Sequence, residues 1–225
     1  GEKNVLFTNN DSAYQAVISL YQKGINIEAV VDIREEVDSK LIKETEKNNI
    51  KVYKGYTVVD TSGYKRINKV SIMQLSKDGQ KAIGSKISIS CDCLGISGGW
   101  TPAVHLFTQS GGKLKFRDED QVFIPNIYPS DQISIGSCNG DFTLDEILST
   151  VPKTLKEFLN LKKTNYEDLE IKSSFNKSKR NIWLLPSDKV IGKTKPFVDY
   201  QNDATAKDIK LALREGFRSI EHVKR

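Results

Sequence analysis

Residues 4–53 alternate between short apolar runs and longer stretches of helical periodicity, and this pattern restricts the fold more than any other feature. Three runs have the length of buried strands: 4–8, 27–33 and 50–53. Two stretches between them have the period of amphipathic helices: 12–23 and 37–48. Strands that alternate with helices pair in parallel through right-handed crossovers, so we predict an α/β fold that begins with a β-α-β-α-β unit.

The first predicted helix carries a single apolar stripe and ends at Gly24. The residues of this stripe are Ala13, Ala16, Val17, Leu20 and Tyr21. Because they recur at helical spacing, we expect them to face the sheet.

The turn after the first strand lacks the glycines of a dinucleotide site. Such a turn reads Gly-x-Gly-x-x-Gly, so that backbone amides reach a pyrophosphate, whereas residues 8–13 read Thr-Asn-Asn-Asp-Ser-Ala. Asp11 would place a negative charge beside the phosphate. Asp32 stands where a ribose-binding acid is often found, and a solvent-exposed aspartate at a strand end is the alternative interpretation. The pattern disfavours a tight NAD site in this half.

Residues 54–90 have the alternation of β-hairpins, with turn residues at 61–64 and 77–79. A meander of this kind is a common insertion between two α/β halves. Alternation continues over 87–92 and predicts a strand, which runs into Gly95, Gly98 and Gly99. Thr101 and Pro102 are typical of the start of a short helix that ends at Gln109.

The order of strand, glycine-bearing turn and helix recurs further along the chain. Residues 132–140 predict a strand that ends in Gly-Ser-Cys-Asn-Gly, and residues 142–161 predict a helix capped by Thr143. The free amides at that helix start suit an anion, although a tight turn without a ligand is equally compatible.

Residues 165–181 are polar and rich in lysine, which indicates a linker or an exposed loop, and Trp183 with its apolar neighbours could anchor it. Thr205 and Asp208 then open a helix that reaches Gly216. Ser219 is placed to cap another helix, so a small helical domain begins here. Both ends of the chain look cut, and we expect a fragment of a longer protein.

Composition excludes several classes of function. The three cysteines, Cys91, Cys93 and Cys138, fit a reducing compartment, and we expect the cytoplasm. Cys91 and Cys93 are two apart on a predicted strand, so both should face one side; with only His105 and His222 as further ligands, small core residues are favoured over zinc. The net charge of +5 comes from scattered residues, which disfavours nucleic acid, and no apolar run or secretory leader predicts a membrane segment.

Three stretches of the chain together resemble the α subunit of heterotetrameric sarcosine oxidase. They are 5–14 (VLFTNNDSAY), 97–106 (SGGWTPAVHL) and, most specific, 197–225, which opens with FVDYQND. The resemblance spans nearly the whole chain. It implies a Rossmann-like FAD/NAD(P)-binding fold, similar to the pyridine nucleotide-disulfide oxidoreductases: a three-layer sandwich with a β-meander, followed by the start of a small helical domain.

The resemblance also implies a division of the chain into four parts. Residues 1–90 would form a degenerate NAD(P)-binding-like half-Rossmann domain with β-hairpins, and 91–164 the return segment of the first dinucleotide-binding domain. Residues 165–196 would be a linker, and 197–225 the truncated start of the helical domain. The first domain's own glycine fingerprint and the folate-binding module would lie outside this chain.

In this family the α subunit holds NAD noncovalently, while FAD and FMN are carried mainly by the partner β subunit, which oxidises the amine. The resemblance therefore implies a complex with β, γ and δ subunits that demethylates sarcosine to glycine. The one-carbon unit passes to tetrahydrofolate or leaves as formaldehyde, and oxygen becomes hydrogen peroxide.

Two sets of residues match family positions near a dinucleotide. Gly98, Gly99 and Trp100 match the Ser-Gly-Gly-Trp turn, and a second set matches the return segment: Gly136, Ser137, Asn139 and Gly140. No residue is typical of a general base, so we expect no catalytic residue and no metal ligand in this chain. His105 could approach a nucleotide, but a histidine in a capped helix is the favoured interpretation.

Other functions stay open at this point. Subunits of N-methylglutamate, opine or cyanide-forming amine dehydrogenases share the fold and part of the motif set. A stand-alone pyridine-nucleotide reductase would need the glycine fingerprint and usually a Cys-x-x-Cys pair, and this chain has neither. A non-catalytic scaffold with decayed nucleotide sites would bind no NAD.

Overall fold

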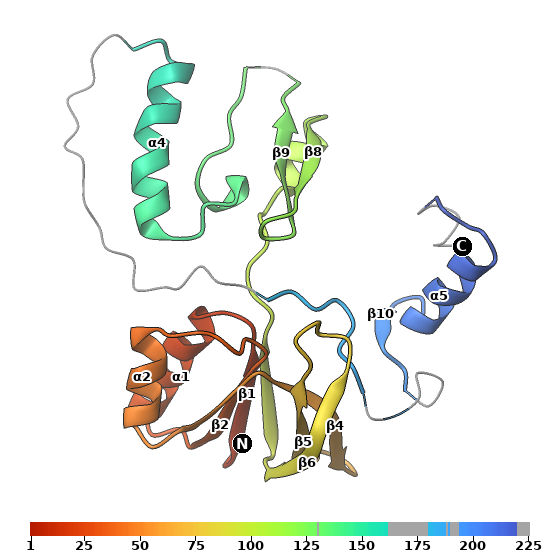
Figure 1. Ribbon diagram of the computed structural model, residues 1–225. Helices are drawn as coiled ribbons and strands as arrows, with labels where there is room; N and C mark the ends of the chain where they lie inside the picture. Colours follow the sequence, from red (N-terminus) through yellow and green to blue (C-terminus); the bar gives the residue numbers. More distant parts are fainter. Residues whose placement is uncertain (130, 162–179, 188, 190–193, 220–225) are drawn as a thin grey trace.

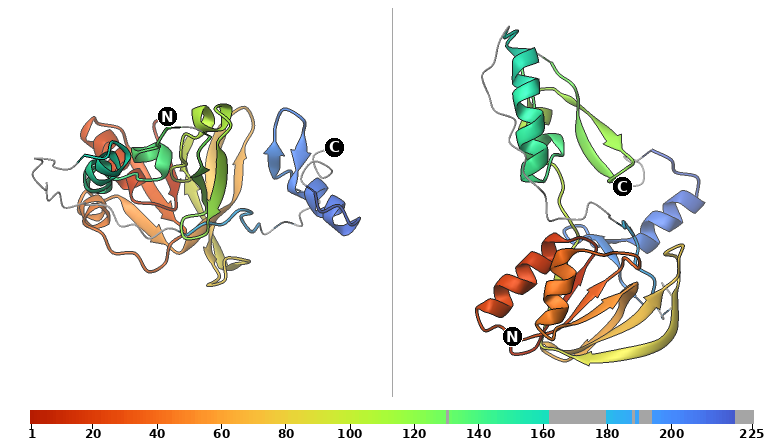
Figure 2. Two further views of the ribbon diagram at one scale, coloured as in Figure 1. Left: turned by 90° about the horizontal axis from the view of Figure 1, so that it is seen from above. Right: turned by 60° about the vertical axis from the view of Figure 1, so that its left-hand side comes forward.

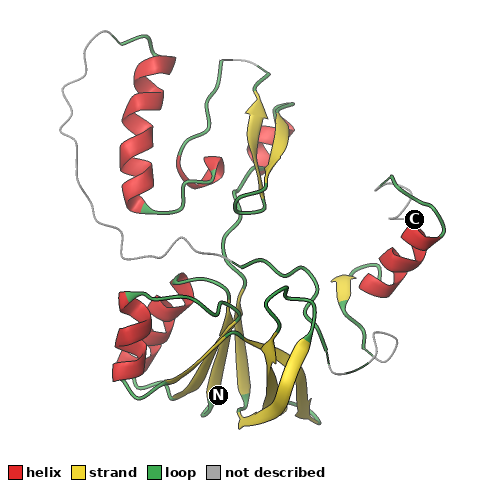
Figure 3. Cartoon of the chain, in the orientation of Figure 1, coloured by secondary structure: helices red, strands yellow, loops and turns green. Residues whose placement is uncertain are grey.

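The computed structural model describes residues 1–129, 131–161, 180–187, 189 and 194–219. Figure 1 shows three parts: an N-terminal α/β body, a part made of a hairpin and a long helix, and a C-terminal part with a short helix. Figure 3 shows that most of the strands belong to the first part.

The first part is built on a four-stranded parallel sheet. Its strands are β1 (Asn4–Thr8), β2 (Ile27–Asp32), β3 (Lys51–Lys54) and β7 (Cys93–Ser97). The order is β3-β2-β1-β7, and each neighbouring pair is parallel. Helices α1 (Ser12–Gln22) and α2 (Lys40–Lys47) connect the first three strands. The predicted β-α-β-α-β unit and the α/β class are confirmed.

A β-meander occupies the chain between β3 and β7. Its strands are β4 (Tyr56–Gly63), β5 (Ile67–Leu75) and β6 (Ala82–Ser90), all antiparallel, in the order β4-β5-β6. This confirms the hairpins predicted for residues 54–90. The right-hand view of Figure 2 shows the meander strands on the opposite side of the parallel sheet from α1 and α2.

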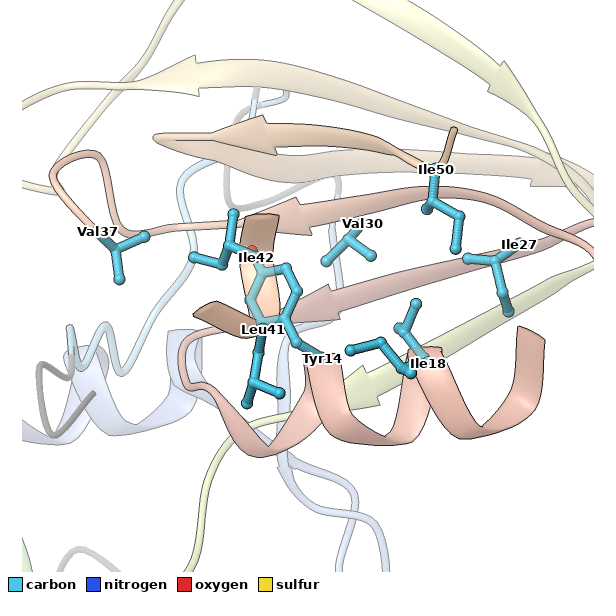
Figure 4. Close-up of a cluster of buried hydrophobic side chains, with 9 residues drawn as sticks. Tyr14, Ile18, Ile27, Val30, Val37, Leu41, Ile42 and Ile50 are labelled. Atoms are coloured by element: carbon cyan, nitrogen blue, oxygen red, sulfur yellow. The ribbon is translucent and has the colours of Figure 1, made fainter. Parts of the chain in front are cut away.

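Alternating residues of the parallel strands face two separate cores. Val30 packs with α1 and α2 in the cluster drawn in Figure 4, and the partly buried Leu6 packs against the same cluster. Val5, Phe7 and Val31 pack against the meander residues on the other face. The result is a three-layer arrangement of helices, parallel sheet and meander, as predicted. Full burial of each such aliphatic side chain contributes roughly 1.5–3 kcal/mol.

The buried face of α1 differs from the predicted stripe. The buried residues are Ala13, Tyr14, Val17 and Ile18, whereas Leu20 and Tyr21 are exposed and so is Ala16. The prediction assumed that every apolar residue of the stripe faces the sheet. The helix is instead turned so that Tyr14 points inward, where its hydroxyl meets Asp32.

The strand predicted over residues 87–92 stops two residues early, and a separate strand follows it. β6 ends at Ser90 and β7 begins at Cys93, so Gly95 lies within a strand rather than in a turn. At the break, the Asp92 carboxylate accepts hydrogen bonds from the backbone amides of Glu2 and Lys3, at 2.8 and 3.0 Å. Cys91 is consequently buried and Cys93 exposed, and the prediction that both face one side is wrong. β7 lies beyond residue 90 and belongs to the sheet of the first part.

The second part contains α3 (His105–Gln109), β8 (Lys113–Arg117), β9 (Val122–Ile127), the 3-10 turn η1 (Gly136–Asn139) and α4 (Leu144–Phe158). Strands β8 and β9 are antiparallel. The helix α4 has the predicted cap, in which Thr143 pairs with Glu146. Two predictions are wrong: α3 begins at His105 rather than Thr101, and the segment 132–140 forms a 3-10 turn instead of a strand.

The third part consists of β10 (Phe197–Asp199), β11 (Ala204–Thr205) and α5 (Ala206–Arg214). The predicted cap of α5 is present, with Thr205 paired to Asp208. Most of the lysine-rich segment 165–181 lies outside the described residues, as does the helix expected after Ser219.

Candidate functional site

A cavity of about 550 Å³ lies where β1 and β7 end. The chain leaves β1 toward β2 on one side and returns to β7 on the other, so the strand order reverses between these two strands. Open α/β sheets bind their ligands at such a switch point, beyond the carboxyl ends of the strands. The residues that line the cavity are Phe7, Thr8, Asn9, Ile33, Ile96, Ser97, Gly98, Gly99, Trp100, Thr101, Asp120, Gln121, Val122, Asn181, Ile182, Trp183 and Leu185.

Hydrogen bonds join the ends of the two strands. The Thr8 hydroxyl and the Asn10 amide both donate to the Ser97 carbonyl, at 3.1 and 3.2 Å. The Trp100 indole donates to the Ser12 hydroxyl at 3.1 Å. These contacts hold the Ser-Gly-Gly-Trp turn against the first turn of the sheet and thereby form one wall of the cavity.

The segment 180–187 forms another side of the cavity. The Asn181 amide donates to the Asp120 carbonyl at 3.2 Å, and the Trp183 indole donates to the Gln121 side chain at 2.7 Å. Arg180 anchors the segment by donating to the carbonyls of Ile33 and Ser76, at 3.0 and 2.7 Å. Trp183 is thus bonded to the turn between β8 and β9, while most of the lysine-rich segment that it was expected to anchor lies outside the described residues.

A buried ionic cluster lies behind the first turn. The Arg34 guanidinium is 2.9 Å from the Asp11 carboxylate and 2.7 Å from the Asp32 carboxylate, and the three side chains are 2%, 1% and 0% exposed. The Tyr14 hydroxyl donates to Asp32 at 2.9 Å. Asp32 is thus neither exposed nor open to a ribose, and both interpretations given to it from the sequence are wrong.

The packing of this cluster shifts the pKa values of Tyr14 and Arg34. Burial and the neighbouring Asp32 carboxylate raise the pKa of the Tyr14 hydroxyl well above its usual value. Burial opposes the charge of Arg34, but its hydrogen bond to Asp32 and the charges of both carboxylates outweigh this and raise the guanidinium pKa. The cluster therefore stays ionised at Arg34 and neutral at Tyr14 across the physiological range.

The first turn of this sheet does not suit a pyrophosphate. At the start of α1, the Asn10 side chain accepts a hydrogen bond from the Ser12 amide at 3.1 Å, which is an amide that a phosphate would use. Asp11 places a carboxylate at the same helix end, and its counter-charge is the buried Arg34. The cavity lining holds no Lys, Arg or His among the described residues. A dinucleotide phosphate would therefore find no cation in the described lining, where Asp120 is the one carboxylate.

The two predicted sets of site residues lie in different places. Gly98, Gly99 and Trp100 line the cavity. Gly99 has a φ of +98°, which favours glycine, and a side chain there would face Asn9. His105 is exposed and is not part of the lining.

The second set lies outside the cavity, in and beside η1: Gly136, Ser137, Asn139 and Gly140. It is connected to the cavity through Arg117, whose guanidinium donates to the Gly140 carbonyl at 3.1 Å and to the Asp120 carboxylate at 2.6 Å. Asp120 in turn lines the cavity.

The sequence did not identify Tyr14, Arg34 or the second tryptophan, Trp183, as site residues. Arg34 carried a usable signal, since it is a cation two residues after an aspartate that ends a buried strand. The chain has two tryptophans, and their rarity was a second signal in the sequence. Both of them line the cavity.

Other classes of site are absent from the residues that the structure describes. No group of three or more His, Cys, Asp or Glu residues is placed to hold a metal. Within the same residues, every helix is too short or too polar to cross a membrane.

Comparison with known proteins identifies relatives over the whole chain. The subunit alpha of sarcosine oxidase from Corynebacterium sp. (strain P-1) is 31% identical over 236 residues, which covers 100% of this chain and 24% of that protein. The subunit alpha from Rhizobium meliloti (strain 1021) is 28% identical and covers 100% of this chain and 22% of that protein. The chain thus spans about a quarter of the length of these curated relatives.

A family model and a solved structure agree with these relatives. Residues 193–225 match the model of the sarcosine oxidase A3 domain. The crystal structure of L-proline dehydrogenase from P. horikoshii aligns with 100% of this chain and 40% of its own, with 16% identity and a TM-score of 0.53. The fold prediction is confirmed by this structure, and the resemblance to sarcosine oxidase α subunits is confirmed by the sequence relatives.

Proposed function

We propose that this chain, which corresponds over its whole length to a segment of sarcosine oxidase subunit alpha, serves in an oxidoreductase complex that demethylates sarcosine. Sarcosine, oxygen and water would give glycine, formaldehyde and hydrogen peroxide, with tetrahydrofolate as an alternative acceptor of the one-carbon unit. The observation that carries the proposal is the match, at 31% identity, that covers 100% of the chain.

This chain would hold NAD and contact other subunits rather than catalyse the reaction. The cavity lining consists of aliphatic, aromatic, glycine, hydroxyl and amide groups with a single carboxylate, Asp120. That carboxylate accepts hydrogen bonds from Arg117 at 2.6 and 2.8 Å, so it is already paired. Amine oxidation needs a flavin beside the substrate, and we assign that step to a partner subunit.

The NAD of such a complex would not lie at the first turn of the β1–β7 sheet, because the Asn10 side chain already accepts a hydrogen bond from the Ser12 amide and the described cavity lining offers no cation. The residues of this chain that remain for it are Gly136, Ser137, Asn139 and Gly140. Within this turn Ser137 is exposed, whereas Gly136 and Gly140 are buried. We propose that these residues approach the dinucleotide from the return segment.

The second part has the surface expected of a segment that completes a domain built by another stretch of chain. α4 contains no buried residue, and Leu144 at its start and Phe158 at its end are both exposed. Phe123 and Ile127 of β9 are exposed as well. We propose that residues outside this chain, and the β, γ and δ subunits of the complex in the cytoplasm, cover these side chains.

Oxygen uptake by the native complex containing this chain tests the proposal. Sarcosine and N-methylglutamate are supplied separately, and hydrogen peroxide is assayed in the same sample. Uptake with sarcosine and one peroxide per oxygen is the expected result. Dye reduction with N-methylglutamate, together with no oxygen uptake with sarcosine, would instead place the chain in the related amine dehydrogenases.

A non-catalytic scaffold is the second candidate, favoured by the ionic cluster that occupies the first turn. It predicts that the purified complex releases no NAD on denaturation. Release of about one NAD per complex would remove this candidate.

A further inference from the structure

We propose that the cavity at the ends of β1 and β7 binds an uncharged, planar aromatic ring without a phosphate. The cavity occupies the position at which α/β sheets bind ligands, and its volume of about 550 Å³ is in the usual range for small molecules. The lining, however, is unlike that of a phosphate site. The proposal concerns this ligand chemistry and does not depend on the identity of the amine substrate.

Two indole rings provide the surface for stacking. The N–H of Trp100 donates to Ser12 at 3.1 Å, and that of Trp183 donates to Gln121 at 2.7 Å, so hydrogen bonds fix both rings. Their residues are nevertheless 65% and 78% exposed. A fixed, exposed indole face is a platform for a second aromatic ring, which stacks on it through dispersion and quadrupole contacts.

The inner wall of the cavity is apolar. Phe7 and Ile33 are buried residues of the core between the sheet and the meander, and Ile182 packs against the same core. All three line the cavity. A ring that enters would exchange water for this wall, which favours an aromatic body over a sugar or a free amino acid.

Charge in and around the cavity selects against an anion. Among the described residues the lining has no cationic side chain and one carboxylate, Asp120. Asp120 is itself paired with the Arg117 guanidinium at 2.6 Å. The remaining polar side chains are the amides of Asn9, Gln121 and Asn181 and the hydroxyls of Thr8, Ser97 and Thr101. These groups are uncharged and suit the nitrogen and carbonyl edges of a heterocycle.

Intrinsic fluorescence tests the proposal, because both tryptophans of the chain line the cavity and therefore report on it alone. The chain is titrated with adenosine, nicotinamide and riboflavin, and with their phosphate forms AMP, NMN and FMN. We expect saturable quenching by at least one of the free rings, and at least tenfold weaker binding of its phosphate form. Quenching by none of the three rings, or equal or tighter binding of the phosphate form, would overturn the proposal.

Substitutions separate stacking from a general loss of structure. Trp183→Phe keeps an aromatic face and is expected to retain binding, followed through Trp100, while Trp183→Ala should weaken it about tenfold. Far-UV circular dichroism checks that both variants keep the fold. Equal binding by the Phe and Ala variants would show that the indole face does not hold the ring.

Discussion

The Arg34 guanidinium and the Asp32 carboxylate lie 2.7 Å apart in the interior, with side chains 2% and 0% exposed. A buried charge is costly unless it is paired and hydrogen-bonded. Asp32 meets this condition by accepting hydrogen bonds from the Arg34 side chain at 2.7 Å, the Arg34 amide at 2.9 Å and the Tyr14 hydroxyl at 2.9 Å. The cluster therefore makes three elements interdependent: the first turn, α1 and the end of β2.

Replacement of Arg34 by methionine is expected to destabilise the chain by about 3–5 kcal/mol, because it leaves Asp11 and Asp32 buried without their counter-charge. Urea denaturation followed by circular dichroism measures the loss. The matched control is Lys43→Ala, which removes an ion pair with Asp38 that is exposed on both sides and should cost at most about 1 kcal/mol. Similar losses in the two variants would contradict the role assigned to the buried cluster.

Tyr14→Phe removes one hydroxyl from the same cluster and leaves the ring in place. Because the hydroxyl donates to a charged carboxylate, we expect a loss of about 1.5–3 kcal/mol near neutral pH. Tyr64→Phe, at a side chain that is 97% exposed, should leave the free energy of unfolding unchanged. Urea midpoints of the two variants measure the difference.

The pH dependence of that loss has a definite sign. The pKa of Tyr14 is raised in the folded state by burial and Asp32, so only the unfolded chain ionises this tyrosine at a pKa of about 10. The contribution of Tyr14 is then fully present below about pH 10 and falls as the pH rises further. The stability gap between the native chain and Tyr14→Phe should narrow above pH 10; a constant gap up to pH 11 would argue against the raised pKa.

The elements that were predicted correctly are those whose signal is local. The short apolar run at residues 4–8 was sufficient to identify β1 as a buried strand; in the structure Val5 and Phe7 face one core and Leu6 the other. The caps of α4 and α5 were also predicted, since Thr143 with Glu146, and Thr205 with Asp208, lie three residues apart.

The features that were missed depend on distant residues. Trp100 reaches Ser12 across 88 positions of the sequence, and Arg34 meets Asp11 only after α1 and β2 have formed. The break between Cys91 and Cys93 is likewise set by the amides of Glu2 and Lys3, which hydrogen-bond to Asp92. A pattern within one segment does not contain such contacts, so the sequence pointed to Gly98, Gly99 and Trp100 without revealing what surrounds them.

The cap of α5 predicts an acid-sensitive helix start. The pKa of Asp208 is lowered by hydrogen bonds from the Thr205 hydroxyl and amide, so its stabilising contribution is present above its unfolded pKa of about 3.9 and is lost as the pH falls through the lower folded value. The protection factors of the α5 amides, which are exchange rates corrected for the intrinsic effect of pH, should fall below about pH 4. Asp208→Asn should abolish this pH dependence, whereas Asp203→Asn, outside the cap, should preserve it.

Gly140 and Gly24 provide a matched pair for testing the link between η1 and the cavity. Both have positive φ, +89° and +80°, but a side chain at Gly140 would lie 2.6 Å from an Arg117 nitrogen while one at Gly24 would meet nothing within 4 Å. Gly24→Ala should therefore cost only the backbone strain, about 1 kcal/mol. Gly140→Ala should cost about 2 kcal/mol, because it also displaces Arg117 from Asp120. Equal urea midpoints for the two variants would show that Arg117 moves aside freely; a larger loss for Gly140→Ala means that η1 and the cavity wall are held together through this arginine.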